Sequence, residues 1–227
     1  MVRHEAAEAL GAIADTKCKR VLEKYLKDEC KEVSDTCELA LRRIEDVEKE
    51  KKEKKEKEEG KEEEKQVGST SQFNTVDPIL TQMKEKSLEE LEKLALNESA
   101  SMHDRYDAIF QLRNRASPSV AIRCFTQCLT TSQSALLKHE VAFVLGQLQN
   151  AEATQILVKI LRDKEEHPMV RHEAAEALGS VAKSDKEMCK ILEEYCGDND
   201  LIVAQSCEVA LDMLKNEGEF EYCETLA

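Results

Sequence analysis

Apolar residues along this chain recur at the three-to-four-residue spacing of amphipathic helices, and the pattern itself is duplicated. The sequence MVRHEAAEALG occurs identically at residues 1–11 and 169–179. A related copy, KHEVAFVLGQ, occupies residues 138–147 and keeps the apolar positions and the glycine. In the copy at 169–179 and just beyond it, one helical face carries the apolar residues Ala174, Ala177, Leu178 and Val181. These copies predict repeated helical units.

The repeat has a period of 33 residues, measured from His139 to His172. The same step leads back to Tyr106-Asp107 and forward to Gln205-Ser206. Leucines stay in register with it at Leu112, Leu145, Leu178 and Leu211. A long period without the alternating pattern of strands is typical of stacked helical hairpins. We therefore predict an all-α fold, an α-solenoid of helical hairpins.

The N-terminal part of the chain copies the end of the C-terminal part. Residues 1–45 predict one and a half to two hairpins, with helices at 4–13, 19–26 and 34–44. The segment DTCELALRRIE at 35–45 matches QSCEVALDMLK at 205–215, with an offset of 170 residues. The solenoid thus consists of two pseudo-repeated halves, of which the first is incomplete.

A charged stretch separates the halves. Residues 46–65 hold ten acidic and eight basic side chains and almost nothing to bury. We predict a solvated linker, helical in part through Glu-Lys pairs, followed by a loop. The predicted domains are an incomplete N-terminal half at 1–45, a linker and loop at 46–76, and a C-terminal half at 77–227. A helix is expected from Ser87 to Leu96 at the start of the C-terminal half.

Composition and charge narrow the classes of partner that the chain is expected to bind. The formal net charge is −14, which disfavours nucleic acid as a ligand. No apolar run approaches the roughly 20 residues that a membrane span needs, so we expect no membrane association. The nine cysteines form no CxxC motif and several fall in helical patterns. We interpret them as reduced thiols and expect a cytoplasmic protein.

The candidate chemistry lies in pairs of adjacent histidine and glutamate. Three such pairs occur at equivalent repeat positions: His4-Glu5, His139-Glu140 and His172-Glu173. Equivalent positions stack in a solenoid, so we expect the last two pairs to be neighbours. Imidazole and carboxylate together bind iron, manganese or zinc. Glu8 and Glu176, one turn after His4 and His172, are placed to orient those histidines.

A simpler alternative is that the pairs recur only because the repeat recurs, with both side chains on a solvated face. Tyr106-Asp107 and Gln205-Ser206 show that the repeat tolerates other pairs, which favours the metal site. A metalloprotease HExxH motif is absent because position 143 is Phe and positions 8 and 176 are Glu. His103 and His167 lie near turns, where we expect satisfied or exposed histidines.

The segments LLKHEVAFVLGQLQ, MVRHEAAEALG and SCEVALDML together resemble deoxyhypusine hydroxylase, a HEAT-repeat di-iron monooxygenase family whose two halves are joined by a variable acidic loop. The resemblance implies hydroxylation of the deoxyhypusine side chain of translation initiation factor 5A to hypusine by dioxygen. It implies two Fe²⁺ ions per complete site, held here by His4, Glu5, His139, His172 and Glu173. It further implies that Glu140 is the catalytic carboxylate that binds the substrate amine.

The chain departs from this family in one respect. The family has four His-Glu pairs, and the first pair of the first half has no counterpart here. We expect one iron to lose a histidine ligand, with impaired or no activity if the chain is the whole product. The other reading, which we favour because the three pairs are intact, is a fragment or a mispredicted start of a complete enzyme. A different function class also remains open, a non-enzymatic HEAT scaffold that binds protein. A third possibility is a phycobilin-lyase-like solenoid, but the segment SCEVALDML and the charged linker argue against it.

Overall fold

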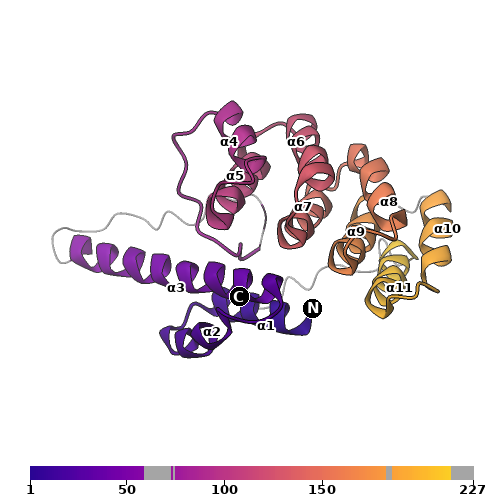
Figure 1. Ribbon diagram of the computed structural model, residues 1–227. Helices are drawn as coiled ribbons and strands as arrows, with labels where there is room; N and C mark the ends of the chain where they lie inside the picture. The colour runs from indigo at the N-terminus through magenta and orange to yellow at the C-terminus, as the bar shows by residue number, and fades with distance from the viewer. Residues whose placement is uncertain (59–72, 74, 183–185, 216–227) are drawn as a thin grey trace. The chain divides into compact units, whose positions relative to one another are not determined.

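The computed structural model describes residues 1–58, 73, 75–182 and 186–215, and every regular element in these ranges is a helix (Figure 1). The chain packs as two compact units, Met1–Arg115 and Ala116–Ala227. The predicted all-α fold of helical hairpins is confirmed. Among the described residues, no helix combines the length and the apolar character required to cross a membrane.

The first unit consists of three α-helices that contain the N-terminal repeat and of two further α-helices that follow the charged stretch. Its elements are α1 (Val2–Ile13), η1 (Thr16–Cys18), α2 (Lys19–Tyr25), α3 (Lys31–Glu58), α4 (Leu88–Ala95) and α5 (Met102–Arg115). Helices α1 and α2 pack on α3, and α4 packs on α5. Ser87 caps α4 in a reciprocal capping box with Glu90, which explains why this helix begins where the sequence predicts.

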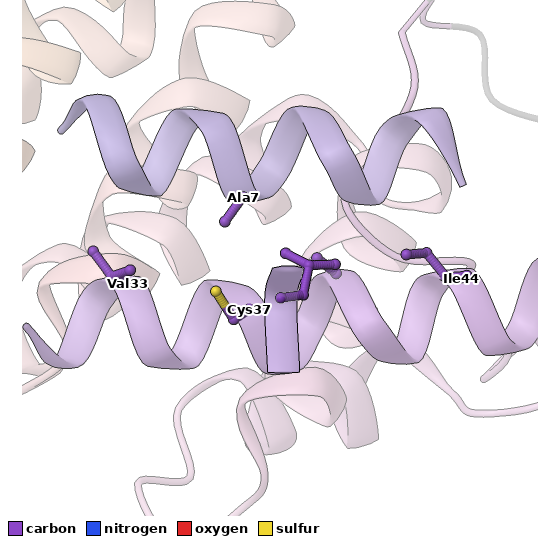
Figure 2. Packing of buried hydrophobic residues seen from close by; sticks show 6 residues of the cluster. Ala7, Val33, Cys37 and Ile44 are labelled. Carbon is purple, nitrogen blue, oxygen red and sulfur yellow. The ribbon is translucent and has the colours of Figure 1, made fainter. Parts of the chain in front are cut away.

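A small apolar core holds α1, α2 and α3 together (Figure 2). The figure labels Ala7 on α1 facing Val33, Cys37 and Ile44 along α3. All four side chains are buried, as are Leu22 and Ala40 in the same cluster. The period of three to four residues between the α3 members is the amphipathic stripe that the sequence shows.

Helix α3 does not end at residue 45, where we set the first domain limit, but continues to Glu58. Residues 46–58 contain alternating Glu and Lys, which are good helix formers and pair with each other one turn apart. The charged stretch is therefore helical in this part. Most of the remainder, residues 59–72 and 74, lies outside the described residues.

The second unit is a run of three hairpins. Its elements are α6 (Pro118–Thr131), α7 (Ala135–Leu148), η2 (Ala151–Ala153), α8 (Thr154–Arg162), α9 (Pro168–Val181), α10 (Lys186–Tyr195) and α11 (Leu201–Lys215). Helices pair as α6 with α7, α8 with α9 and α10 with α11, in the order that Figure 1 shows. Within this unit α7 packs on α9 and α9 on α11, so the second helices of successive hairpins form one stacked layer.

The repeated glycine explains how closely these helices approach. A Cβ on Gly179 of α9 would lie 2.9 Å from the Cα of Ala210 on α11. A Cβ on Gly146 of α7 would lie 3.2 Å from the Cα of Ala177 on α9. Any side chain at these positions meets the backbone of the next helix, so the small residue allows the layer to stack.

Candidate metal centre

The stacked layer brings His139 of α7 beside His172 and Glu173 of α9. The Nε2 atom of His139 is 3.3 Å from a carboxylate oxygen of Glu173. The rings of His139 and His172 lie 5.2 Å apart between centroids and are tilted by 41°. The prediction that pairs one period apart become neighbours is therefore confirmed for these two repeats.

Two capped helix starts fix the position of these side chains. The Ser134 hydroxyl accepts a hydrogen bond from the backbone N–H of Leu137, so α7 begins one turn before His139. Helix α9 begins at Pro168, and the ring of His167 accepts the backbone N–H of Met169. His167 is thus a helix cap, in agreement with the expectation of a satisfied histidine.

His139, His172 and Glu173 form a cluster with the arrangement of a metal site. One ligand atom from each lies within 4.8 Å of the other two. All three residues are buried, with exposed fractions of 6%, 5% and 7%. The alternative of a solvated face is wrong for these residues. Their role as metal ligands stays a prediction.

The electrostatics of the cluster fit a cation. The pKa of Glu173 is raised to about 7, mainly by burial and in addition by the neighbouring Glu176, while His172 acts in the opposite direction. The Nε2 atom of His172 is buried and has no hydrogen-bond partner in the part of the chain that the structure describes. A buried carboxylate whose pKa is raised and a buried imidazole nitrogen both gain from a bound metal ion.

Glu176 lies beside His172 as the sequence predicts. Its Oε1 atom is 3.6 Å from Nδ1 of His172 and accepts a hydrogen bond of 2.7 Å from the hydroxyl of Ser206 on α11. These contacts with His172 and Ser206 lower the pKa of Glu176 despite its partial burial. Glu176 therefore offers a stable negative charge on the side of His172 that faces away from Nε2.

The first unit holds the remaining predicted ligands on α1. His4 is 1% exposed, whereas the side chain of Glu5 is 55% exposed. The Nε2 atom of His4 is 3.7 Å from a carboxylate oxygen of Glu5 and 3.7 Å from one of Glu8. His4, Glu8, Thr36 and Tyr106 line part of one small pocket in this unit.

His103, which the sequence predicts as satisfied or exposed, is buried near the start of α5. Its ring nitrogens are 3.9 Å from a carboxylate oxygen of Asp46 and 3.8 Å from one of Asp104. Burial and the charge of Arg42 lower the pKa of His103, against the opposing effect of these acids. His103 is not among the residues that we propose as metal ligands.

Comparisons with known proteins agree on one family. A sequence profile described as HEAT repeats matches residues 122–212, and a PBS lyase HEAT-like repeat matches residues 2–28. Deoxyhypusine hydroxylase-B of Oryza sativa subsp. japonica is 49% identical over 218 residues, covering 96% of this chain and 67% of the rice protein. Deoxyhypusine hydroxylase of Homo sapiens is 38% identical over 228 residues, covering 100% of this chain and 69% of the human protein.

The structure of human deoxyhypusine hydroxylase in complex with glycerol matches with a TM-score of 0.78 and 38% identity. The match covers 95% of this chain and 68% of the human one. The chain belongs to the deoxyhypusine hydroxylase family. Membership favours the enzymatic prediction over the non-enzymatic scaffold, and it agrees with a fold of HEAT repeats.

Within this family assignment, Glu140 is the remaining predicted site residue. It follows His139 on α7 and is 3% exposed. The structure thus keeps a buried carboxylate next to the proposed metal cluster in the unit Ala116–Ala227. Its catalytic and substrate-binding role stays a prediction.

Sequence reasoning missed the polar side chains that support the pairs. Arg171, directly before His172, is 1% exposed and makes two hydrogen bonds to the carboxylate of Asp198, of 2.6 and 3.2 Å. Its Nε also donates to the carbonyl of Leu161. The sequence does carry a signal for this arginine, because Arg3 and Arg171 each directly precede a His-Glu pair. In the first half, the structure pairs Arg3 with Asp28.

Proposed function

We propose that this chain is a deoxyhypusine monooxygenase that converts the deoxyhypusine side chain of translation initiation factor 5A to hypusine. The observation that carries the proposal is the convergence of His139, His172 and Glu173 from two stacked repeats in a member of this family. In the reaction one oxygen atom of dioxygen enters a C–H bond. The other oxygen atom leaves as water, with electrons and protons from an external reductant.

The residues divide between metal binding and substrate binding. His139, His172 and Glu173 would hold one Fe²⁺, and His4 with Glu5 would contribute to a second. Iron held by these residues would supply the activation of dioxygen. The burial of all three residues of the first set limits the access of water, which protects a reactive centre from side reactions.

Glu140 would position the substrate. The deoxyhypusine side chain carries a cationic amine, and a buried carboxylate is the counter-charge that such an amine needs. A fixed contact at the amine would hold the carbon to be hydroxylated at a constant distance from His139, the proposed metal ligand on the same helix.

The test measures iron content and hydroxylation with the full chain. We expect purified protein loaded with Fe²⁺ to add one oxygen atom to the deoxyhypusine form of the factor, at a rate reduced by the missing first His-Glu pair. His139→Ala and His172→Ala should each lose bound iron and lower kcat/KM by about 1000-fold or more, because several kcal/mol of transition-state stabilisation depend on the metal. The readouts are iron per chain and the mass of the factor.

His167→Asn is the matched control, since it removes an imidazole from the start of the same helix α9 but keeps a capping side chain. Its iron content should equal that of the wild type. Glu140→Gln should keep its iron and raise KM for the factor. Wild-type iron content that survives both alanine substitutions would overturn the proposal.

A further inference from the structure

Two hydroxyl groups at equivalent positions of the two halves contact the histidines of the proposed site. Thr36 on α3 and Ser206 on α11 are related by the same 170-residue offset that relates the flanking sequences. Thr36 lies against His4, and Ser206 lies against His172. We propose that both are positioning residues that hold the hydrogen of each histidine on Nδ1 and so keep Nε2 available for a metal ion. The metal part of this inference rests on the proposed function.

The geometry at Thr36 determines the direction of its hydrogen bonds. Its Oγ1 atom is 2.6 Å from the carbonyl oxygen of Glu32 and 2.7 Å from Nδ1 of His4. A hydroxyl group has a single hydrogen, and a carbonyl oxygen can only accept. The Thr36 hydroxyl therefore donates to Glu32 and accepts from His4. This arrangement places the hydrogen of His4 on Nδ1.

Ser206 repeats the arrangement with a carboxylate in place of the carbonyl. Its hydroxyl donates to Oε1 of Glu176 at 2.7 Å. Nδ1 of His172 is 3.4 Å from the Ser206 oxygen and 3.6 Å from Oε1 of Glu176. Both neighbours of Nδ1 are thus acceptors, so Nδ1 carries the hydrogen. The lone pair of His172 then resides on Nε2, which is buried and has no hydrogen-bond partner among the described residues, and His172 shares a cluster with His139 and Glu173.

The hydroxyl occupies a repeat position where other units have a carboxylate. Ser206 lies one 33-residue period after Glu173 and two after Glu140. A carboxylate at position 206 would place a second negative charge against Glu176, which like-charge repulsion disfavours. A hydroxyl group supplies the acceptor without the charge. The unit that follows His172 therefore supports that histidine instead of contributing a metal ligand, and Thr36 does the same for His4.

Burial makes the contact between each hydroxyl and its histidine important for the tautomer of the ring. His4 and Thr36 are 1% and 3% exposed, and His172 and Ser206 are each 5% exposed. Water competes poorly for Nδ1 at such sites, so loss of the hydroxyl leaves the ring to the tautomer that carries hydrogen on Nε2, the form that neutral histidine favours in water. That tautomer has no lone pair on Nε2 for a metal ion.

The experiment compares removal and retention of the hydroxyl in the full chain. Thr36→Val and Ser206→Ala remove the acceptor, whereas Thr36→Ser and Ser206→Thr retain it. Ser34→Ala on α3 and Thr130→Val on α6 are matched controls, because both hydroxyls bond backbone carbonyls of their own helices and the structure gives them no histidine contact. One readout is the ¹⁵N NMR shift of the histidine rings in metal-free protein at a pH where they are neutral. The other is Fe²⁺ affinity by competition with a chromophoric chelator.

We expect wild-type His4 and His172 to show the Nδ1–H tautomer. Thr36→Val should shift His4, and Ser206→Ala should shift His172, toward Nε2–H. Each loss should weaken Fe²⁺ binding by about 10- to 100-fold, the usual effect of losing a partner of a ligand histidine. The hydroxyl-retaining variants and both controls should match the wild type.

An Nε2–H tautomer at both histidines of the wild type would overturn the inference, as would unchanged tautomers in Thr36→Val and Ser206→Ala. The proposed function fails separately, through the wild-type metal measurement. If the metal-free tautomers respond as expected but wild-type protein binds no Fe²⁺, the positioning role holds and the monooxygenase proposal loses its metal.

Discussion

Two acidic side chains in the unit Ala116–Ala227, Glu173 and Asp198, bind protons with very different affinity. Glu173 has its pKa raised to about 7, chiefly because burial disfavours the anion; the nearby Glu176 adds to this rise, and His172 offsets only part of it. Asp198 has its pKa lowered, because Arg171 donates hydrogen bonds to it and its charge adds to the effect. Asp198 is satisfied by the protein alone. The pKa of Glu173 stays raised despite the nearby His172, and a metal ion would supply further positive charge.

The pair of Arg171 and Asp198 makes stability depend on pH. The folded-state pKa of Asp198 is lower than the unfolded value of about 3.9, so its contribution is present above that value and is lost as pH falls through the folded pKa. We expect Asp198→Asn to lower the free energy of unfolding at neutral pH by about 3 kcal/mol, because Arg171 is left buried without its main partner. Urea denaturation of both proteins from neutral to acidic pH measures the difference.

The difference between wild type and Asp198→Asn should shrink as pH falls below about 4. A difference that stays constant across this range would show that the aspartate contributes through packing and not through its charge. In Asp198→Asn, the carboxylate of Asp200 would still compensate part of the positive charge of Arg171, because its Oδ2 atom lies 3.5 Å from Nη1 of Arg171.

At the scale of elements, the close stacking of α7, α9 and α11 depends on residues without a long side chain at each contact. Gly146 meets Ala177, and one period later Gly179 meets Ala210. The contact repeats with the same period as the His-Glu pairs. The short distances between α7, α9 and α11 and the approach of His139 to Glu173 therefore have one cause, the small residues at these contacts.

Gly179→Ala tests this contact. Alanine favours helix over glycine by about 1 kcal/mol, but here its Cβ would lie 2.9 Å from backbone of α11. We expect a net loss of about 1 to 3 kcal/mol in unfolding free energy, as for overpacked cores. Chemical denaturation measures it, and Gly197→Ala, whose added Cβ meets nothing within 4 Å, should be neutral or slightly stabilising. Equal effects at both positions would contradict the stacking argument.

At the scale of the whole molecule, we expect metal binding and folding to be coupled. The proposed ligands His139, His172 and Glu173 come from two hairpins, so a bound ion favours their stacked arrangement over the unfolded chain. With free Fe²⁺ about 100-fold above its Kd, we expect about 2.7 kcal/mol of added stability. This corresponds to a rise in Tm of about 5 to 10 °C for a chain of this size.

Anaerobic thermal unfolding with Fe²⁺ and with excess chelator measures this rise. His172→Ala should unfold at the same temperature in both conditions. If wild-type protein also showed no difference, the cluster would not bind iron at these concentrations.

Much of the fold was predictable from the sequence, because its pattern is periodic. The step from His139 to His172 predicted which pairs become neighbours, and the structure confirms it. The helix limits were less predictable. The continuation of α3 to Glu58 depends on a balance between helix propensity and solvation in a charged stretch, which no hydrophobic pattern marks.

The supporting residues could not be predicted from spacing alone. Thr36 and Ser206 contact histidines that lie 32 and 34 residues earlier, on a neighbouring helix. The direction of the Ser206 hydrogen bond depends on Glu176, which becomes its partner only after α9 and α11 pack, whereas Thr36 donates to Glu32 one turn earlier on its own helix. Sequence register shows that these hydroxyls are equivalent, but only the packed structure shows what they contact.

The layered construction of the second unit also sets an order of events during synthesis. A ribosome releases His139 with α7, then His172 and Glu173 with α9, and finally Ser206 with α11. The nascent chain therefore carries both proposed ligand histidines before the hydroxyl that orients one of them. If Ser206 has the proposed positioning role, tight metal capture by this unit would become available only after α11 has emerged and docked, which would delay metal loading until late in the synthesis of the unit.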